Sequence, residues 1–132
     1  MTSIRLKAGR TPLALYIVDG DASVREGLTR LAVSAGFEAR PCASAEAFVG
    51  EASSASGACA VVDMCDAGLR DPAIRARLAV LATHLPVIAL SARDDRQTQR
   101  TAQELGAKAF FRKPVDSAAL LDSIDWLVRK TG

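Results

Sequence analysis

The chain has 132 residues, of which 49% are hydrophobic and 24% are charged, as expected for a single globular domain. Its formal net charge of +2 gives no electrostatic reason to expect nucleic acid as the main partner. Three cysteines without a CxxC spacing and one histidine argue against a zinc site, and no apolar run has the length of a signal peptide or a membrane span. We therefore expect a cytoplasmic protein with no membrane partner.

Five short apolar segments are predicted to be β-strands. In chain order they are 13–18, 37–42, 58–62, 87–90 and 107–111. These segments do not alternate strictly between polar and apolar residues, which is typical of parallel strands covered by helices on both faces.

Each predicted strand is followed by a segment with helical features. In chain order these segments are 22–35, 44–52, 72–82, 94–106 and 116–128. Asp71 followed by Pro72 is a favourable helix start, an N-cap with proline at the first helical position. The first helix has two possible starts, either Asp21 as the N-cap or a capping box formed by Ser23 and Glu26.

The five strand–helix repeats predict an α/β fold. Right-handed crossovers between successive strands give one doubly wound, five-stranded parallel sheet between two helix layers, a (βα)5 flavodoxin-like arrangement. In the last helix, Leu120, Ile124, Leu127 and Val128 share the face predicted to point inward. Trp126 falls off that face and suggests a contact surface.

Polar residues stand where the predicted strands end. The first strand is followed by Asp19-Gly20-Asp21, the third by Asp63, the fourth by Ser91 and the fifth by Arg112-Lys113. In open parallel sheets, ligands bind outside the carboxyl ends of the strands. Clustered carboxylates favour a cation such as Mg²⁺, and a lysine and a hydroxyl beside them suit phosphoryl oxygens. This edge therefore predicts phosphoryl transfer with a carboxylate as the nucleophile.

Three motifs resemble the CheY-like receiver domain of two-component response regulators. They are VVD at 61–63, LSA at 90–92 and GAKAFFRKP at 106–114, and the similarity runs from about Leu13 to Val128. FEARPCASAEAFV and LPVIALSA look most like the FixJ-type branch, whose members usually carry a C-terminal DNA-binding domain. The resemblance implies an N-terminal tail at 1–12 and a receiver domain at 13–130. It implies no output domain in this chain, so contact with DNA would need such a domain.

The resemblance assigns the chemistry to named residues. Asp63 would be the phosphoacceptor, taking a phosphoryl group from a sensor histidine kinase or a phosphotransfer protein. Mg²⁺ would be bound by Asp19, Asp63 and the backbone carbonyl of Cys65. The chain would be a phosphoacceptor rather than an enzyme, with at most self-catalysed phosphotransfer and dephosphorylation.

The resemblance also implies a switch. Ser91 and Lys113 would contact the phosphoryl group, and Ser91 and Phe110 would change position with it. The bond between Lys113 and Pro114 would be a cis peptide, a form that is common only before proline. The signal would pass to a protein-binding face built from 94–106, 107–111 and 116–128, with a homodimer as one output.

The sequence departs from the family pattern at the acidic pocket. Gly20 stands where the family usually has a second metal-binding acid, and the loop 64–71 lacks the usual Met-Pro and Gly pattern. Asp21 is either an auxiliary metal ligand or a helix N-cap. The departures leave open a receiver-like interaction module that does not depend on phosphorylation. A further alternative is that DGDAS at 19–23 serves a haloacid-dehalogenase-type phosphatase with Asp19 as its nucleophile.

Overall fold

A computed structural model describes residues 13–52, 58–93 and 95–131 of the chain. The segments 1–12 and 53–57, expected to be a tail and a loop, lie outside the described residues. Within the described part, no helix is both long enough and apolar enough to cross a membrane.

Five parallel strands form one sheet, as predicted. They are β1 (Ala14–Val18), β2 (Glu38–Cys42), β3 (Cys59–Asp63), β4 (Val87–Ser91) and β5 (Ala109–Arg112). Their order across the sheet is β2-β1-β3-β4-β5, so the chain reverses its direction of winding after β2. All five carboxyl ends lie at one edge of the sheet, which is where the predicted site residues follow the strands.

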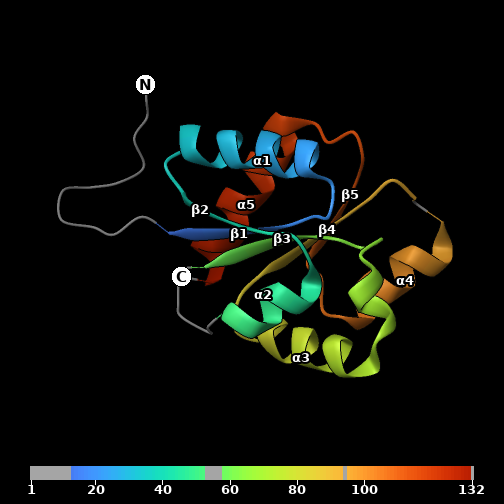
Figure 1. Cartoon of the computed structure of the whole chain (residues 1–132). Coiled ribbons are helices and arrows are strands. Elements are labelled where there is room, and N and C mark those ends of the chain that lie inside the picture. Colours follow the sequence, from blue (N-terminus) through green and yellow to red (C-terminus); the bar gives the residue numbers. More distant parts are fainter. Residues whose placement is uncertain (1–12, 53–57, 94, 132) are drawn as a thin grey trace.

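Helices cover both faces of the sheet (Figure 1). They are α1 (Ala22–Ser34), α2 (Ala45–Glu51), α3 (Pro72–Ala82), α4 (Arg96–Glu104) and α5 (Ser117–Thr131). Helices α1 and α5 lie on one side of the sheet, and α2, α3 and α4 lie on the other. The doubly wound architecture expected from the sequence is confirmed.

Short polar side chains begin most of these helices. The side chains of Asp21, Ser44, Asp71 and Asp95 accept hydrogen bonds from backbone N–H groups in the first turns of α1, α2, α3 and α4. The first turn of a helix leaves its N–H groups without intrahelical partners, and these side chains satisfy some of them. Asp21, rather than a capping box, therefore starts α1.

The strands divide the apolar residues between two cores. In β1, Tyr16 and Val18 face the core beneath α2 and α3, while Leu15 and Ile17 face the core beneath α1 and α5. Successive side chains of a strand point to opposite faces, so a strand covered on both sides must be apolar throughout. All five residues of β3 and of β4 are accordingly buried.

Three local features add to the sequence-based expectation. The loop 64–71 contains a 3₁₀ helix, η1 (Ala67–Arg70), which begins where the Asp66 side chain accepts a hydrogen bond from the N–H of Gly68. Phe110 lies on β5, an edge strand, and is partly exposed. In α1 the buried residue is Ala32, and the partly buried Leu28, Leu31 and Ala35 pack against the same core. The edge position of a strand is a tertiary feature that periodicity does not report.

Candidate functional site

Asp19 is held at the end of β1 by contacts from three sides. Its backbone N–H donates to the carbonyl of Cys42 at 3.2 Å, and its carboxylate Oδ1 accepts the N–H of Asp21 at 2.9 Å. Its Oδ2 lies 2.7 Å from the Nζ of Lys113. The residue is only 1% exposed, and a carboxylate buried to this extent needs such partners.

Asp63 ends β3 and is 8% exposed. Its Oδ1 accepts the N–H of Cys65 at 3.1 Å and lies 3.5 Å from the Nζ of Lys113. Both contacts fall on Oδ1, so Oδ2 accepts no hydrogen bond from the described residues. Burial raises the pKa of Asp63, and the nearby charge of Asp19 adds to this rise, while the Cys65 N–H and the Lys113 ammonium oppose it.

Lys113 connects the two carboxylates. Its ammonium contacts Asp19 and Asp63, and its backbone N–H donates to the carbonyl of Ser91 at 2.9 Å, continuing the pairing of β4 with β5. Burial alone lowers the pKa of Lys113, but its hydrogen bonds and its charge interactions with the two aspartates outweigh burial and raise it. The peptide bond between Lys113 and Pro114 is cis.

Ser91, at the end of β4, is completely buried. Its Oγ accepts the N–H of Arg93 at 2.9 Å and lies 3.6 Å from the Sγ of Cys65. The hydroxyl is therefore engaged by the loops that follow β3 and β4.

Four predicted site residues thus lie in one contact network. Asp19, Asp63, Ser91 and Lys113 come from the ends of β1, β3 and β4 and from just beyond β5. Cys65, predicted only as a source of a backbone carbonyl, joins this network through both its N–H and its thiol.

Two predicted residues do not bring their side chains into the network. The Asp21 carboxylate caps α1, with Oδ1 2.9 Å from the N of Ser23, and no contact joins it to Asp63 or Lys113 in the part of the chain that the structure describes. Phe110 lines a depression of about 140 Å³ between α4 and β5, together with Ala102 and Gln103.

The site contains two carboxylates for a metal rather than three. No group of three histidine, cysteine, aspartate or glutamate side chains is placed to hold a metal among residues 13–52, 58–93 and 95–131. Mg²⁺ usually keeps several waters and needs only one or two protein carboxylates. Asp19, Asp63 and a main-chain carbonyl therefore suit Mg²⁺, with fewer protein charges than a pocket containing a second acid at Gly20.

Arg25 is a site neighbour that sequence reasoning missed. Its Nη1 donates to the backbone carbonyl of Asp19 at 2.7 Å from the first turn of α1. This contact supports the backbone immediately before Gly20. Its sequence signal was an arginine one helical turn after the N-cap, which by itself indicates no contact with the preceding strand.

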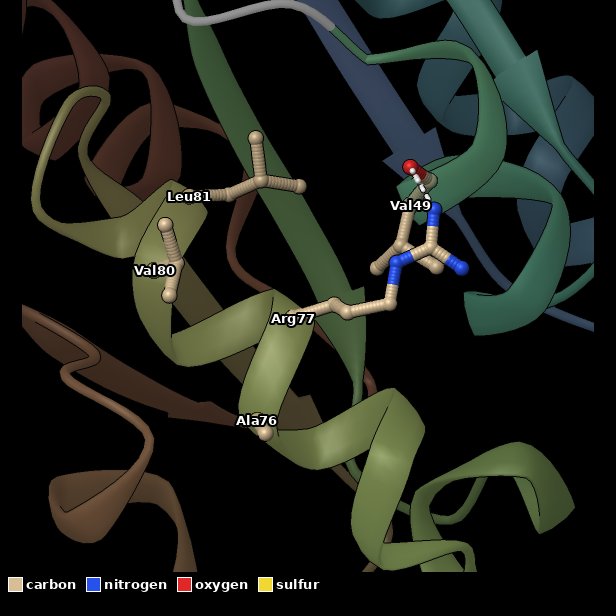
Figure 2. Close-up of a pocket in the computed structure, with 5 residues that line it drawn as sticks. All are labelled: Val49, Ala76, Arg77, Val80 and Leu81. Carbon is tan, nitrogen blue, oxygen red and sulfur yellow. Dashed lines mark hydrogen bonds between the residues drawn. The ribbon is translucent and has the colours of Figure 1, made fainter.

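A separate apolar depression of about 350 Å³ lies between α2 and α3 (Figure 2). Four apolar side chains line it, together with Arg77, whose guanidinium donates to the carbonyl of Val49 at 3.2 Å. None of the predicted site residues lines this depression.

Comparisons with known proteins agree with this arrangement. The family model for the response regulator receiver domain matches residues 15–125. The chain is 32% identical over 111 residues to the transcriptional regulatory protein TdiR of Thauera aromatica, covering 84% of this chain and 49% of TdiR. It is 30% identical over 112 residues to the transcriptional regulatory protein FixJ of Azorhizobium caulinodans, covering 85% of this chain and 53% of FixJ. The chain thus spans about half the length of the curated relatives it matches.

Solved structures show the same likeness. The response regulator StyR superposes with a TM-score of 0.78 at 30% identity, covering 92% of this chain and 61% of StyR. Full-length FixJ from B. japonicum gives a TM-score of 0.76 at 28% identity, covering 92% of this chain and 60% of FixJ. A receiver protein from Burkholderia phymatum gives 0.72 at 28% identity, covering 89% of this chain and 95% of that protein.

Proposed function

We propose that this chain, which belongs to the response regulator receiver domain family of two-component signal transduction, accepts a phosphoryl group on Asp63. The observation that carries the proposal is the Lys113 ammonium, which contacts both Asp19 and Asp63 across the carboxyl edge of the sheet. Family membership favours this function over a phosphatase that uses Asp19. The family acts as a phosphoacceptor and not as a conventional enzyme.

The hydrogen bonds of Asp63 suggest which oxygen reacts. The Cys65 N–H and Lys113 both hold Oδ1, so Oδ2 keeps its lone pairs for attack on phosphorus. A bond forms between Oδ2 and phosphorus, and the bond between phosphorus and the donor's imidazole nitrogen breaks. The imidazole leaves with that electron pair and takes up a proton, so the donor is regenerated as a neutral histidine.

Lys113 and Ser91 suit the product of this step. An ammonium near the acceptor neutralises the charge that a phosphoryl group adds, and a hydroxyl supplies a hydrogen bond to it. Receiver domains generally bind Mg²⁺ at their acidic pocket. Here we assign its ligands to Asp19, Asp63 and the carbonyl of Cys65, and Mg²⁺ would supply further charge neutralisation. Asp21 is a weaker candidate, because its carboxylate already caps α1.

We further propose that the phosphoryl donor is a sensor histidine kinase or a phosphotransfer protein. The response would pass through Ser91 and Phe110 to the face formed by α4, β5 and α5, where a second copy of the chain could bind. Helix α4 suits this role because Ala102 is its only buried residue, which leaves it lightly anchored. Relatives named as transcriptional regulators suggest that contact with DNA would require an additional output domain.

The test is the intact mass of the protein after incubation with Mg²⁺ and phosphoramidate. We expect one added phosphoryl group in the wild type, no adduct in Asp63→Asn, and normal labelling in Asp122→Asn, an exposed control on α5. Unchanged labelling of Asp63→Asn would overturn the assignment. Loss of the adduct in Asp19→Asn alone would favour the phosphatase alternative.

Failure to label any variant would favour the phosphorylation-independent module. A Mg²⁺ titration, followed by the unfolding temperature, then decides whether the acidic pocket retains its metal. Absence of any Mg²⁺ effect up to physiological concentrations would support that alternative.

A further inference from the structure

One residue of the site, Cys65, contacts both the acceptor and the hydroxyl of the predicted switch. Its backbone N–H donates to Oδ1 of Asp63 at 3.1 Å, and its Sγ lies 3.6 Å from Oγ of Ser91. One contact uses the main chain of Cys65 and the other its side chain. A change at Asp63 or at Ser91 therefore alters a contact that Cys65 makes.

The hydroxyl of Ser91 is held in its present position by two partners. The N–H of Arg93 donates to Oγ at 2.9 Å, and the thiol of Cys65 is the second partner. No hydrogen bond of this hydroxyl goes to the side chain of Asp63 or Lys113 among the contacts of the described residues. The hydroxyl has a single proton to donate, so a proton directed at the Cys65 sulfur must leave that sulfur in order to bond a phosphoryl oxygen on Asp63.

Burial makes this exchange sensitive to each partner. Ser91 is completely buried, so a hydroxyl that leaves one partner must find another within the protein or lose that hydrogen bond altogether. A phosphoryl oxygen provides the replacement only when Asp63 is modified. The partners in the unmodified state therefore oppose the movement, each in proportion to its strength.

We propose that Cys65 is a positioning residue whose thiol holds the Ser91 hydroxyl in its resting position and so sets how readily Ser91 moves when Asp63 is phosphorylated. This inference rests on the proposed function. The Arg93 partner is a main-chain N–H, which among substitutions only proline removes, so the thiol is the part of this contact that sequence variation adjusts most readily. A thiol is a weak hydrogen-bonding group, which makes the restraint a modest one that phosphorylation can overcome.

The size of the effect follows from the strength of one hydrogen bond. Losing a bond of ordinary net strength changes an equilibrium constant by about two- to tenfold. Removing the thiol should therefore shift the balance between the two Ser91 positions by about this factor toward the phosphorylated arrangement.

The backbone N–H of Arg93 provides a direct spectroscopic report, because it donates to Ser91 Oγ in this structure and the proposed movement of Ser91 would alter that bond. We would record ¹H–¹⁵N spectra of wild type, Cys65→Ala, Cys65→Ser and Cys59→Ala, before and after phosphorylation with phosphoramidate and Mg²⁺. Cys59→Ala is the matched control, because it removes a sulfur from the opposite end of β3 and leaves the Ser91 contact intact.

In unphosphorylated Cys65→Ala, the Arg93 resonance should be displaced along the line toward its phosphorylated position. Cys65→Ser keeps a hydroxyl in place of the thiol and should return the resonance toward wild type, whereas a purely structural effect would not be rescued in this way. Cys59→Ala should match wild type.

The role of Cys65 alone would be refuted by the following result. Cys65→Ala can still be phosphorylated on Asp63, but the Arg93 resonance of its unphosphorylated form stays at the wild-type position. Absence of a phosphoryl adduct in every protein would refute the proposed function and the role of Cys65 with it. Intact mass separates these two results.

Discussion

At the scale of single residues, the reactivity of Asp63 depends on opposing influences at one carboxylate. Burial raises its pKa from the ordinary value of 3.8, and the Cys65 N–H and the Lys113 ammonium counteract that rise. The ionised form is the nucleophile, so these contacts keep the acceptor usable in a buried site.

A pH titration of the Asp63 side-chain ¹³C resonance tests this balance. The midpoint should lie above 3.8, because burial outweighs the contacts that favour the ionised form. In Lys113→Met the midpoint should rise further, since the ammonium that lowers the pKa is gone. A midpoint at or below 3.8 in the wild type, or a lower one in Lys113→Met, would contradict the prediction.

The same pKa direction has a consequence for stability. A carboxyl group whose pKa is higher in the folded state binds its proton more tightly there, so its contribution to the free energy of unfolding increases as pH falls through the folded pKa. At neutral pH the ionised Asp63 therefore destabilises the fold, and Asp63→Asn should raise the unfolding temperature. The increase should shrink as pH falls through the Asp63 pKa, which thermal unfolding at several pH values would reveal.

Gly20 determines how many carboxylates the pocket offers to Mg²⁺. A Cβ at this position would have Ala43 O as its nearest neighbour, at 3.7 Å, and the backbone φ is not in the left-handed region. Gly20→Asp should therefore be accommodated without strain. The added carboxylate should tighten Mg²⁺ binding by on the order of tenfold, because it contributes a full charge close to the cation.

The rise of the unfolding temperature with Mg²⁺ concentration measures this affinity, since a ligand that binds only the folded state stabilises it. Gly50→Asp is the matched control, because it adds the same charge at an exposed position on α2 where a Cβ meets nothing within 4 Å. Equal Mg²⁺ responses of the two variants would show that position 20 does not face the metal site.

At the scale of secondary-structure elements, Gly106 connects α4 to β5 and fixes where the strand carrying Phe110 begins. Its φ is +90°, and a Cβ placed there would lie 3.1 Å from the Cβ of Ala82. The left-handed conformation and the close approach both favour glycine. Helix α4 ends at Glu104, and Gly106 follows its C-cap residue, a position where glycine adopts the left-handed turn most easily.

Gly106→Ala should reduce the free energy of unfolding by about 1–2 kcal/mol, from backbone strain and the contact with Ala82. Gly50→Ala, in the open and helical environment of α2, should instead increase it by about 0.5–1 kcal/mol. Urea denaturation of the two variants gives the comparison. A Gly106→Ala variant as stable as wild type would show that this turn relaxes freely.

At the scale of the whole molecule, the two hydrophobic cores lie on opposite faces of the central strands, and α4 contributes little to either core. Strands β3 and β4 are buried along their entire length, whereas α4 buries only Ala102. Segments with few buried apolar contacts open locally at low free energy. Stability is therefore concentrated in the centre of the sheet, and α4, the proposed responsive helix, lies where it is low.

Native-state hydrogen exchange tests this distribution. The amides of β1, β3 and β4 should exchange most slowly, and α4 should exchange fastest among the five helices. Helix α3, which buries Ile74, Leu78 and Ala82, provides the internal comparison. Protection of α4 equal to that of α3 would argue against α4 as the element that responds to phosphorylation.

The sequence alone determined the fold class, the approximate bounds of the strands and helices, and the edge at which Asp19, Asp63, Ser91 and Lys113 gather. These follow from short-range patterns, since apolar runs, caps and the glycine at 106 each act within a few residues. The topology of a parallel sheet then brings the strand ends together without further information.

The tertiary structure decided which of several available partners each polar atom of the site contacts. The Asp21 side chain caps α1, Cys65 contacts Ser91 through its thiol, and Arg25 supports the backbone of Asp19. Each is a competition among several donors and acceptors whose distances are set by the packing of separate elements. Spacing along the chain does not contain those distances, which is why these contacts emerge only when the strands and loops are in place.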